Sequence, residues 1–196
     1  IRYRRVDIAG DMDHSMIIPR KALTLLRSTI PSENTNVSVE FNAANAFFSF
    51  GNIKMICRLI DERFPDYENV IPVDNENNMV IDRVEFLSSL KRIAIYANKT
   101  THQVRLKITG SELMISAEDL DFSNEANERL SCEHEGEDIE IGFNAKFLIE
   151  MLSNLESAKL MMKLQAANKA GLIIPEEKDD DEDLLMLVMP VMLNNY

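Results

Sequence analysis

The strongest constraint on the fold is a pattern that occurs three times along the chain, a strand followed by a helix and three further strands. Three similar segments mark its starts, each with an apolar strand end followed by the first turn of a helix: Ile17–Leu23, Val80–Phe86 and Ile141–Phe147. The period is about 60 residues. One unit has too small a sheet to close a core, whereas two units give a helix pair against two sheets. The sequence therefore predicts an α+β fold of repeated β-α-β-β-β units, with helices on one face and antiparallel sheets on the other.

Apolar periodicity places the individual elements. Helices are predicted at Arg20–Ile30, Arg83–Ala97 and Ala145–Leu155, with Asp82 and Asn144 as N-caps of the second and third. Leu23 and Leu25 belong to the apolar stripe of the first helix, and Phe147 is among the residues of the third helix predicted to face inward. The strands are predicted at 15–18, 37–41, 46–50, 53–59, 79–81, 103–108, 112–118, 122–132, 139–143, 159–165, 172–174 and 184–189.

The repeats also predict the domains. Residues 73–196 hold two units and make a whole domain, whereas residues 1–72 hold about one unit and resemble half of one. A half-domain should expose sheet edges and an apolar face. The chain starts with Ile1 in the middle of a strand pattern, so we expect it to be a fragment.

The segment from Phe64 to Pro72 joins the two predicted domains. Its two prolines fix φ and remove backbone donors, so the segment should cross in an extended, poorly paired conformation. Two interpretations are open. The crossing either covers a hydrophobic groove of its own chain or forms one wall of a groove for another chain.

Charge is divided unevenly along the chain. The net charge is −12, which by itself argues against nucleic acid. The three predicted helices nevertheless carry seven basic and two acidic residues, so the excess of acid lies in strands and loops. Charged helix exteriors can give such a difference by chance. The alternative is that all three helices face a polyanion.

No catalytic or metal-binding pattern is evident. His14, His102 and His134 are scattered, and no glycine-rich phosphate loop occurs. The acidic run 176–183 lacks the glycine and spacing of a calcium loop, so a solvated hairpin loop is predicted. The two isolated cysteines favour a cytoplasmic protein with reduced thiols. No apolar run is long enough for a membrane span. We expect no enzyme, no metal and no cofactor.

Two motifs carry a resemblance to a known family. Arg63–Tyr67 (Arg-Phe-Pro-Asp-Tyr) followed by Val70–Pro72 (Val-Ile-Pro) resembles the segment joining the middle and last domains of the bacterial DNA polymerase III β sliding clamp. Leu187–Leu193 is similar to the C-terminal tail of that family. The resemblance runs from about Ile1 to Leu193 and implies the DNA-clamp fold, with 1–72 as the C-terminal part of a truncated middle domain and 73–196 as a complete last domain.

The resemblance implies a function and partners. Two subunits of three similar domains would close a homodimeric ring around duplex DNA, with helices lining the hole, and hold a polymerase on it. Partners implied are the DNA polymerase III catalytic subunit, the clamp loader and other proteins with a clamp-binding motif. The alternative is an acidic structural or peptide-binding module that does not encircle DNA, and a nuclease using the acidic clusters is more distant.

Site residues follow from the same resemblance. The implied DNA-facing residues are Arg20, Lys21, Arg27, Arg83, Lys91, Arg92 and Lys146. The implied walls of a hydrophobic peptide pocket are Pro65, Asn69, Val70, Val188, Met189, Pro190, Val191, Met192 and Leu193. Ile95 and Tyr96 are implied at the subunit contact, beside an acidic run at 118–121 with Glu125 and Glu128. Asn69 and Met192 stand where many members have arginine, which leaves the peptide preference open.

Overall fold

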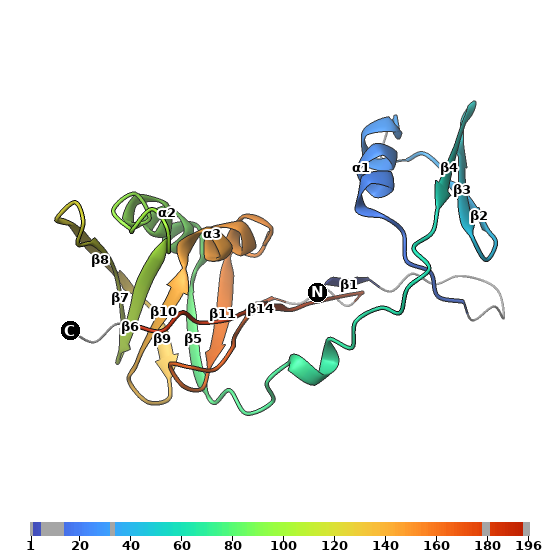
Figure 1. The fold of residues 1–196 in the computed structure, drawn as a ribbon. Helices are drawn as coiled ribbons and strands as arrows, with labels where there is room; N and C mark the ends of the chain where they lie inside the picture. Colours follow the sequence, from blue (N-terminus) through green and yellow to red (C-terminus); the bar gives the residue numbers. More distant parts are fainter. Residues whose placement is uncertain (1, 5–13, 32–33, 178–180, 194–196) are drawn as a thin grey trace. The chain divides into compact units, whose positions relative to one another are not determined.

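The computed structural model describes residues 2–4, 14–31, 34–177 and 181–193, which separate into two compact units (Figure 1). The larger unit comprises residues 2–4 and 68–193, and the smaller comprises 14–67. The division after Tyr67 falls before the predicted boundary at residue 72. Each unit is described by itself below.

The larger unit contains two main sheets in which every strand pairing is antiparallel. One has the order β10-β6-β7-β8 and the other β14-β12-β11-β5-β9, while β1 and β13 form a two-stranded ribbon. The strands are β1 (Arg2–Arg4), β5 (Asn77–Asp82), β6 (Gln103–Thr109), β7 (Glu112–Asp119), β8 (Asn124–Ser131), β9 (Glu133–Glu135), β10 (Ile139–Asn144), β11 (Lys159–Leu164), β12 (Gly171–Pro175), β13 (Glu182–Leu184) and β14 (Met186–Val188).

The two repeats of this unit exchange their first strands. β5 begins the repeat that continues into β6, β7 and β8, yet it pairs with β11, with Val80 opposite Met161. β10 begins the next repeat and pairs with β6, with Ile141 opposite Leu106. The four-stranded sheet therefore contains β6, β7 and β8 of one repeat with β10 of the next, and the five-stranded sheet contains β11, β12 and β14 with β5 and β9 of the preceding repeat. Neither repeat completes its sheet alone.

Helices α2 (Arg83–Ile93) and α3 (Ala145–Ser153) contact each other and lie side by side over the strands (Figure 1). Each starts directly after an exchanged strand. The Asp82 carboxylate accepts from the Glu85 N–H at 2.8 Å, and the Asn144 side chain accepts from the Lys146 N–H at 3.0 Å. Both predicted N-caps are confirmed, and each satisfies a backbone donor that the helix itself leaves free.

The core of the larger unit joins both helices to both sheets. Phe86 and Leu90 of α2 and Leu148 and Leu152 of α3 are fully buried in it. Burying each side chain stabilises the fold by about 1.5–3 kcal/mol. The predicted inward position of Phe147 is wrong, because its side chain is 55% exposed. The buried residues of α3 follow a helical spacing that leaves position 147 on another face.

The smaller unit is one repeat without a partner. It contains α1 (Arg20–Thr29) and a sheet of β2 (Ser38–Phe41), β3 (Asn45–Phe50) and β4 (Ile53–Arg58), in that order. Its core cluster is small, built on Ala46, Phe48 and Cys57. Two residues of the predicted apolar stripe, Leu23 and Leu25, are not covered, since their side chains are 45% and 56% exposed.

The strand predicted at residues 15–18 is also not formed. In the larger unit, the first strand of each repeat pairs with the other repeat's sheet. The described residues 14–67 contain no second sheet, so this segment has no strand to pair with. The same absence explains why α1 buries none of its residues. In this repeat the structure therefore confirms the predicted helix and the three strands that pair with one another, β2, β3 and β4.

Three further predictions need correction. The crossing is not extended throughout, because Glu68–Val70 forms a 3₁₀ turn in which the Ile71 N–H donates to the Glu68 carbonyl at 3.2 Å. The strand predicted at 122–132 is shorter, and after Cys132 the chain enters the other sheet as β9. The strand predicted at 184–189 is two strands, β13 and β14, because each pairs with a different sheet. β13 also takes in the end of the predicted acidic loop, of which residues 178–180 lie outside the described residues.

One charged pair ties α2 to the edge strand β8. Arg92 donates from Nε to Glu128 Oε1 at 2.7 Å and from Nη2 to Oε2 at 2.6 Å. The hydrogen bonds from Arg92 hold the pKa of the Glu128 carboxyl below its usual value. The same bonds raise the pKa of Arg92. Because the pKa of Glu128 is lowered on folding, its ionised form stabilises the folded state.

We expect Glu128→Gln to lower the melting temperature slightly at neutral pH, where the carboxylate is ionised. The difference from wild type should shrink as the pH falls below about 4.3, the usual glutamate pKa, and vanish below the lowered folded-state pKa. Thermal unfolding followed by circular dichroism from pH 7 to pH 3 measures this. Glu125→Gln on the same strand, which lies opposite Glu118 rather than a cation, is the control and should not lower stability. A difference for Glu128→Gln that is constant with pH would contradict the prediction.

Candidate functional site

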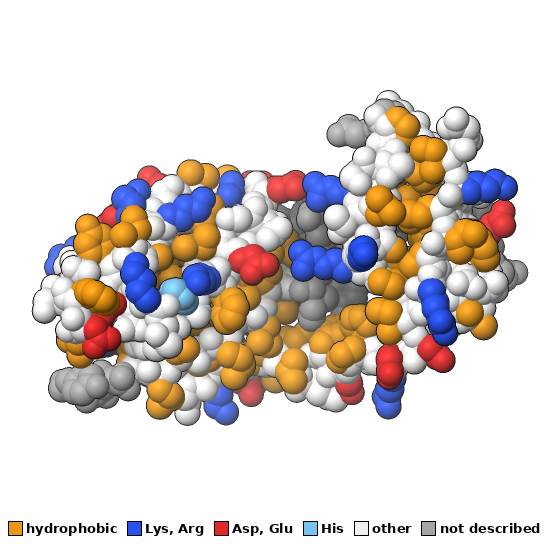
Figure 2. All heavy atoms as spheres, turned by 45° about the horizontal axis from the view of Figure 1, so that its top comes forward, with side chains coloured by type: hydrophobic (Ala, Val, Ile, Leu, Met, Phe, Trp, Pro, Cys, Tyr) orange, Lys and Arg blue, Asp and Glu red, His pale blue; other side chains and the backbone are white. Residues whose placement is uncertain are grey.

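The exposed faces of α2 and α3 carry basic side chains. Lys91, Arg92 and Lys146 are exposed, and Arg83 is partly buried with its Nε donating to the Ser157 carbonyl at 2.7 Å. Figure 2 brings the helix side forward and shows Lys and Arg side chains interspersed with hydrophobic ones over this part of the molecule. The structure thus brings the four predicted basic residues of this unit onto one helix pair.

These four residues are not equally available to a ligand. Arg92 is held by both oxygens of Glu128, and Arg83 is held against the loop before β11. Within the part of the chain that the structure describes, Lys91 and Lys146 enter no ion pair. Lys91 and Lys146 are therefore the stronger candidates for binding an anion on this face.

The other three predicted basic residues lie on α1 in the smaller unit. Arg20, Lys21 and Arg27 are all exposed, and the helix has no acidic residue. Arg27 lies in its last turn, where a cation interacts favourably with the helix dipole. Because α1 carries no carboxylate of its own, the described residues of this helix contribute only positive charge.

The C-terminal tail crosses from one sheet to the other in the larger unit. β14 pairs with β12, and beyond it Val191 forms an isolated antiparallel bridge with Gly142 of β10. The Val191 N–H donates to the Gly142 carbonyl at 2.9 Å. The tail thereby joins the edge strands of the two sheets, β14 and β10.

The predicted pocket residues of the tail divide into buried and exposed ones. Met189 and Met192 are 63% and 74% exposed, whereas Pro190, Val191 and Leu193 are partly buried. Val188 is 2% exposed and belongs to the core, which excludes it from an accessible wall. The two methionines therefore form the accessible apolar part of the tail, and such flexible side chains adapt to different partners.

The predicted pocket residues of the crossing lie on both sides of the unit division. Pro65 is in the smaller unit, while Asn69 and Val70 belong to the 3₁₀ turn that starts the larger one. All three are exposed, and Val70 is 63% exposed. Phe64 remains 60% exposed although its ring packs edge-on against Tyr67. The crossing therefore offers apolar side chains to solvent.

Phe147 is a candidate partner-binding residue that the sequence analysis missed. Its ring is 55% exposed on α3, the helix that contacts β14 and follows the strand bridged by the tail. Its apolar character suggested a core residue. The signal that identifies it is phase, because Ala145, Leu148 and Leu152 already supply a complete buried stripe.

The predicted subunit-contact residues form part of a larger exposed apolar group. Ile95 and Tyr96 follow the C-terminal end of α2 and are 66% and 42% exposed. The β7–β8 turn adds Leu120 and Phe122, which are 67% and 69% exposed and which the sequence analysis had not identified as apolar contacts. The Asn98 side chain joins the two segments, with its Nδ2 lying 3.5 Å from oxygens of both Asp119 and Asp121 in that turn.

The acidic residues predicted along this edge have different environments. Glu118, Asp121 and Glu125 are exposed, and Glu118 lies directly opposite Glu125 across the β7–β8 pair. Asp119 is only 3% exposed and accepts from the Asp121 N–H at 3.1 Å, so it organises the turn. Like charges in register destabilise a strand pair, so Glu118 and Glu125 favour a basic partner.

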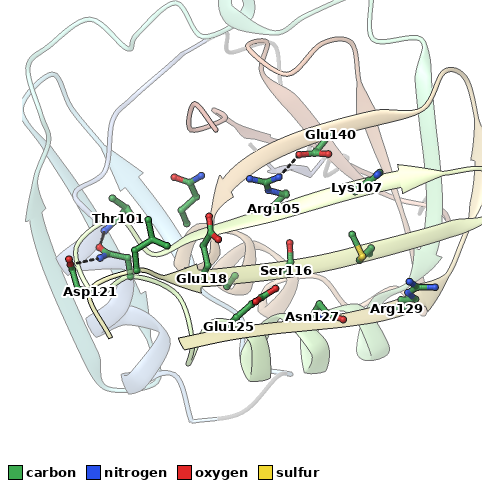
Figure 3. A pocket seen from close by; sticks show the side chains of 15 residues that line it. Thr101, Arg105, Lys107, Ser116, Glu118, Asp121, Glu125, Asn127, Arg129 and Glu140 are labelled. Carbon is green, nitrogen blue, oxygen red and sulfur yellow. Dashed lines mark hydrogen bonds and ion pairs between the residues drawn. The ribbon is translucent and has the colours of Figure 1, made fainter. Parts of the chain in front are cut away.

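The outer face of the four-stranded sheet is hollowed, with a volume of about 680 Å³ (Figure 3). Arg105 and Glu140 form an ion pair across it at 2.7 Å, with Lys107 and Arg129 farther along. Its lining includes no histidine or cysteine and none of the predicted DNA-facing or pocket residues, but it does include Glu118, Asp121 and Glu125 of the predicted acidic edge. Within the described ranges, no group of histidine, cysteine and carboxylate side chains is arranged to hold a metal.

The helices of the described segments are too short or too polar to cross a bilayer.

Two family models match the chain. The model for the C-terminal domain of the DNA polymerase III beta subunit matches residues 68–192, and the model for its central domain matches residues 1–66.

Individual relatives agree with these matches. The beta sliding clamp of Pseudomonas putida KT2440 is 29% identical over 180 residues, covering 92% of this chain and 48% of the relative. That of Bacillus subtilis is 25% identical over 193 residues, covering 97% and 50%. The chain thus spans about half the length of the curated relatives it matches.

A solved structure gives the same result. A sliding clamp from Pseudomonas aeruginosa bound to griselimycin is 28% identical with a TM-score of 0.85, covering 92% of this chain and 48% of that one. It confirms the predicted α+β clamp fold. The two matched domain models and these similarities show that the chain belongs to the DNA polymerase III β subunit family, the β sliding clamps.

Proposed function

We propose that this chain is part of a processivity clamp that encircles duplex DNA and tethers a replicative polymerase. Membership of the β clamp family supports this, because relatives of about twice the length are named beta sliding clamps. The observation that carries the proposal is the positive charge on the exposed faces of the described helices. Among the described residues, basic side chains that enter no ion pair lie on exposed helix faces in a chain whose net charge is −12.

The charge distribution fits a sliding contact. Lysine and arginine side chains that neutralise phosphates bind duplex DNA without reading its sequence. The DNA-facing residues in this proposal are the seven predicted ones. Among the described residues, Arg20, Lys21, Arg27, Lys91 and Lys146 are exposed and enter no ion pair. Acidic residues elsewhere repel DNA and confine it to the helix face.

Partner binding is assigned to the tail and the crossing. Met189 and Met192 expose flexible apolar side chains, Val70 is an exposed apolar residue of the crossing, and Phe147 adds a ring on α3. An extended peptide from the polymerase catalytic subunit, the clamp loader or another clamp-binding protein would bury these side chains. The same observations favour the second candidate function, a peptide-binding module without encirclement, which lacks the DNA contact.

The subunit contact of the homodimer is assigned to the end of α2 and the β7–β8 turn. Four exposed apolar side chains lie there, beside a pair of opposed glutamates. A second subunit with an apolar and basic surface would cover them. We place the protein in the cytoplasm as a non-catalytic accessory subunit.

Encirclement is tested by retention of the full-length protein on nicked circular DNA. The loaded protein should stay on the circle and be lost when the DNA is linearised, because a closed ring leaves only over a free end. Dissociation that does not depend on linearisation would favour the peptide-binding module.

Arg20→Glu with Lys21→Glu should shorten the half-life on the circle about tenfold at moderate salt, since two phosphate contacts become repulsive. Lys54→Glu, an exposed lysine on β4, is the matched control, and equal loss from both variants would contradict the helix assignment.

Partner binding is tested with a fluorescent peptide from the polymerase catalytic subunit. We expect Met189→Ala and Pro190→Ala in the full-length protein each to raise the Kd about tenfold, because apolar contact area is lost from the tail. Met114→Ala, a partly exposed methionine on the hollowed sheet face, should leave the Kd unchanged. Wild-type affinity in both tail variants, measured by anisotropy, would exclude the tail as a pocket wall.

The subunit contact is tested by Ile95→Asp in the full-length protein. A carboxylate buried at an apolar interface without a partner costs several kcal/mol, so the dimer should become monomeric at micromolar concentration. Size-exclusion chromatography with light scattering measures the mass. The control is Val84→Asp, which changes a 54% exposed residue in the first turn of α2, and this variant should remain dimeric. A dimeric Ile95→Asp protein would refute the assignment.

A further inference from the structure

We infer that Gly142 is a positioning residue for the C-terminal tail, and that its lack of a side chain lets residues 191–193 dock on β10. The inference rests on the proposed function in one respect, the role of the tail as a pocket wall. Gly142 itself is not a predicted contact residue. It acts through the tail residues Val191 and Leu193, which approach closely because Gly142 has no side chain.

The space around Gly142 supports this role. A Cβ at this position would lie 2.6 Å from the Val191 carbonyl oxygen and 2.8 Å from Leu193 Cδ2. The third nearest atom, Leu193 Cγ at 3.3 Å, also belongs to the tail. Side-chain carbons do not approach a backbone oxygen this closely, so any other residue would displace the tail.

The alternation of β10 explains why only the tail is affected. Ile141 and Phe143 are fully buried and point into the core, so Gly142 between them faces the opposite side of the sheet. On one edge Gly142 lies opposite Arg105 of β6, and on the other its carbonyl accepts from the Val191 N–H. An alanine here leaves the core residues and the β6 pairing in place.

The bridge at Gly142 fixes the register of the tail. Successive residues of an extended segment point to opposite sides, so a slip by one residue would exchange buried and exposed side chains. With Val191 bridged, Met192 is 74% exposed while Leu193 packs toward Gly142. The methionine is therefore presented to solvent before any partner arrives, which reduces the ordering cost of binding.

The same short segment arranges the neighbouring helix. Asn144, two residues on, caps α3, and its Nδ2 donates to the Thr101 carbonyl at 3.1 Å. Three residues beyond the cap, Phe147 is exposed on α3. Gly142 therefore places the tail beside a strand-to-helix junction whose geometry is fixed by other contacts.

Gly142→Ala in the full-length protein tests the inference, with hydrogen exchange of the Val191 amide as the first measurement. The Val191 N–H loses its bond to Gly142 when the tail is displaced, so its exchange should be at least tenfold faster. Exchange of core amides in β6 and α3 should not change. Unchanged exchange at Val191 would overturn the inference.

A truncated protein shows whether Gly142→Ala acts on the tail or on strand β10 itself. In the protein truncated after Pro190, Gly142→Ala should leave the Tm unchanged, because the tail atoms that the new side chain would meet are absent. An equal loss of Tm with and without residues 191–193 would overturn the inference. Leu193→Ala combined with Gly142→Ala should restore only part of the Val191 protection, because the carbonyl contact remains.

The Kd of the fluorescent polymerase peptide is the second measurement. It should rise about fivefold in Gly142→Ala, while exchange of the core amides in β6 and α3 stays unchanged. Faster Val191 exchange together with an unchanged Kd would leave Gly142 as the residue that positions the tail. That result would overturn the role of the tail in partner binding, which belongs to the proposed function.

Discussion

The exchange of first strands between repeats is the constraint on which the larger unit depends. β5 and β10 each leave their own repeat to complete the sheet of the other. Because α2 and α3 start directly after these strands, the exchange also places the two helices side by side. Their apolar stripes close one core with both sheets, and their charged faces are left on the outside. The geometry of strand pairing thus determines where the basic side chains can act.

Much of this arrangement was predictable from local sequence. The helix starts at Asp82 and Asn144 follow from short capping side chains placed directly before apolar helical stripes. The turns at Gly51 and Gly110 follow from the tolerance of glycine for positive φ, which is 55° and 57° here. The repeated element order predicted an α+β fold of helices against antiparallel sheets, and the resemblance implied the clamp fold. These features depend on residues close together in the chain, so their pattern is readable without tertiary information.

The predictions that failed depended on contacts between distant segments. Residues 15–18 have strand composition but no sheet to join, and Leu23 is exposed because nothing in the described unit covers it. Phe147 was predicted inward because apolar residues usually are, yet the stripe of α3 was already complete. The bridge between Gly142 and Val191 joins residues far apart in sequence, and no local pattern predicts it. The candidate site could therefore be located by motif, but its exposed members could not be distinguished from its buried ones.

The central claim is that DNA meets the helix face of the larger unit and not its outer sheet face. Photocrosslinking of the full-length protein loaded on nicked circular DNA tests this most directly. One variant carries the crosslinking residue at Lys91 on α2, and the other carries it at Lys107 on β6, which lines the hollow of the outer sheet face. The account predicts crosslinks to DNA from position 91 and none above background from position 107. Crosslinks from position 107 alone, or equal yields from both positions, would contradict it.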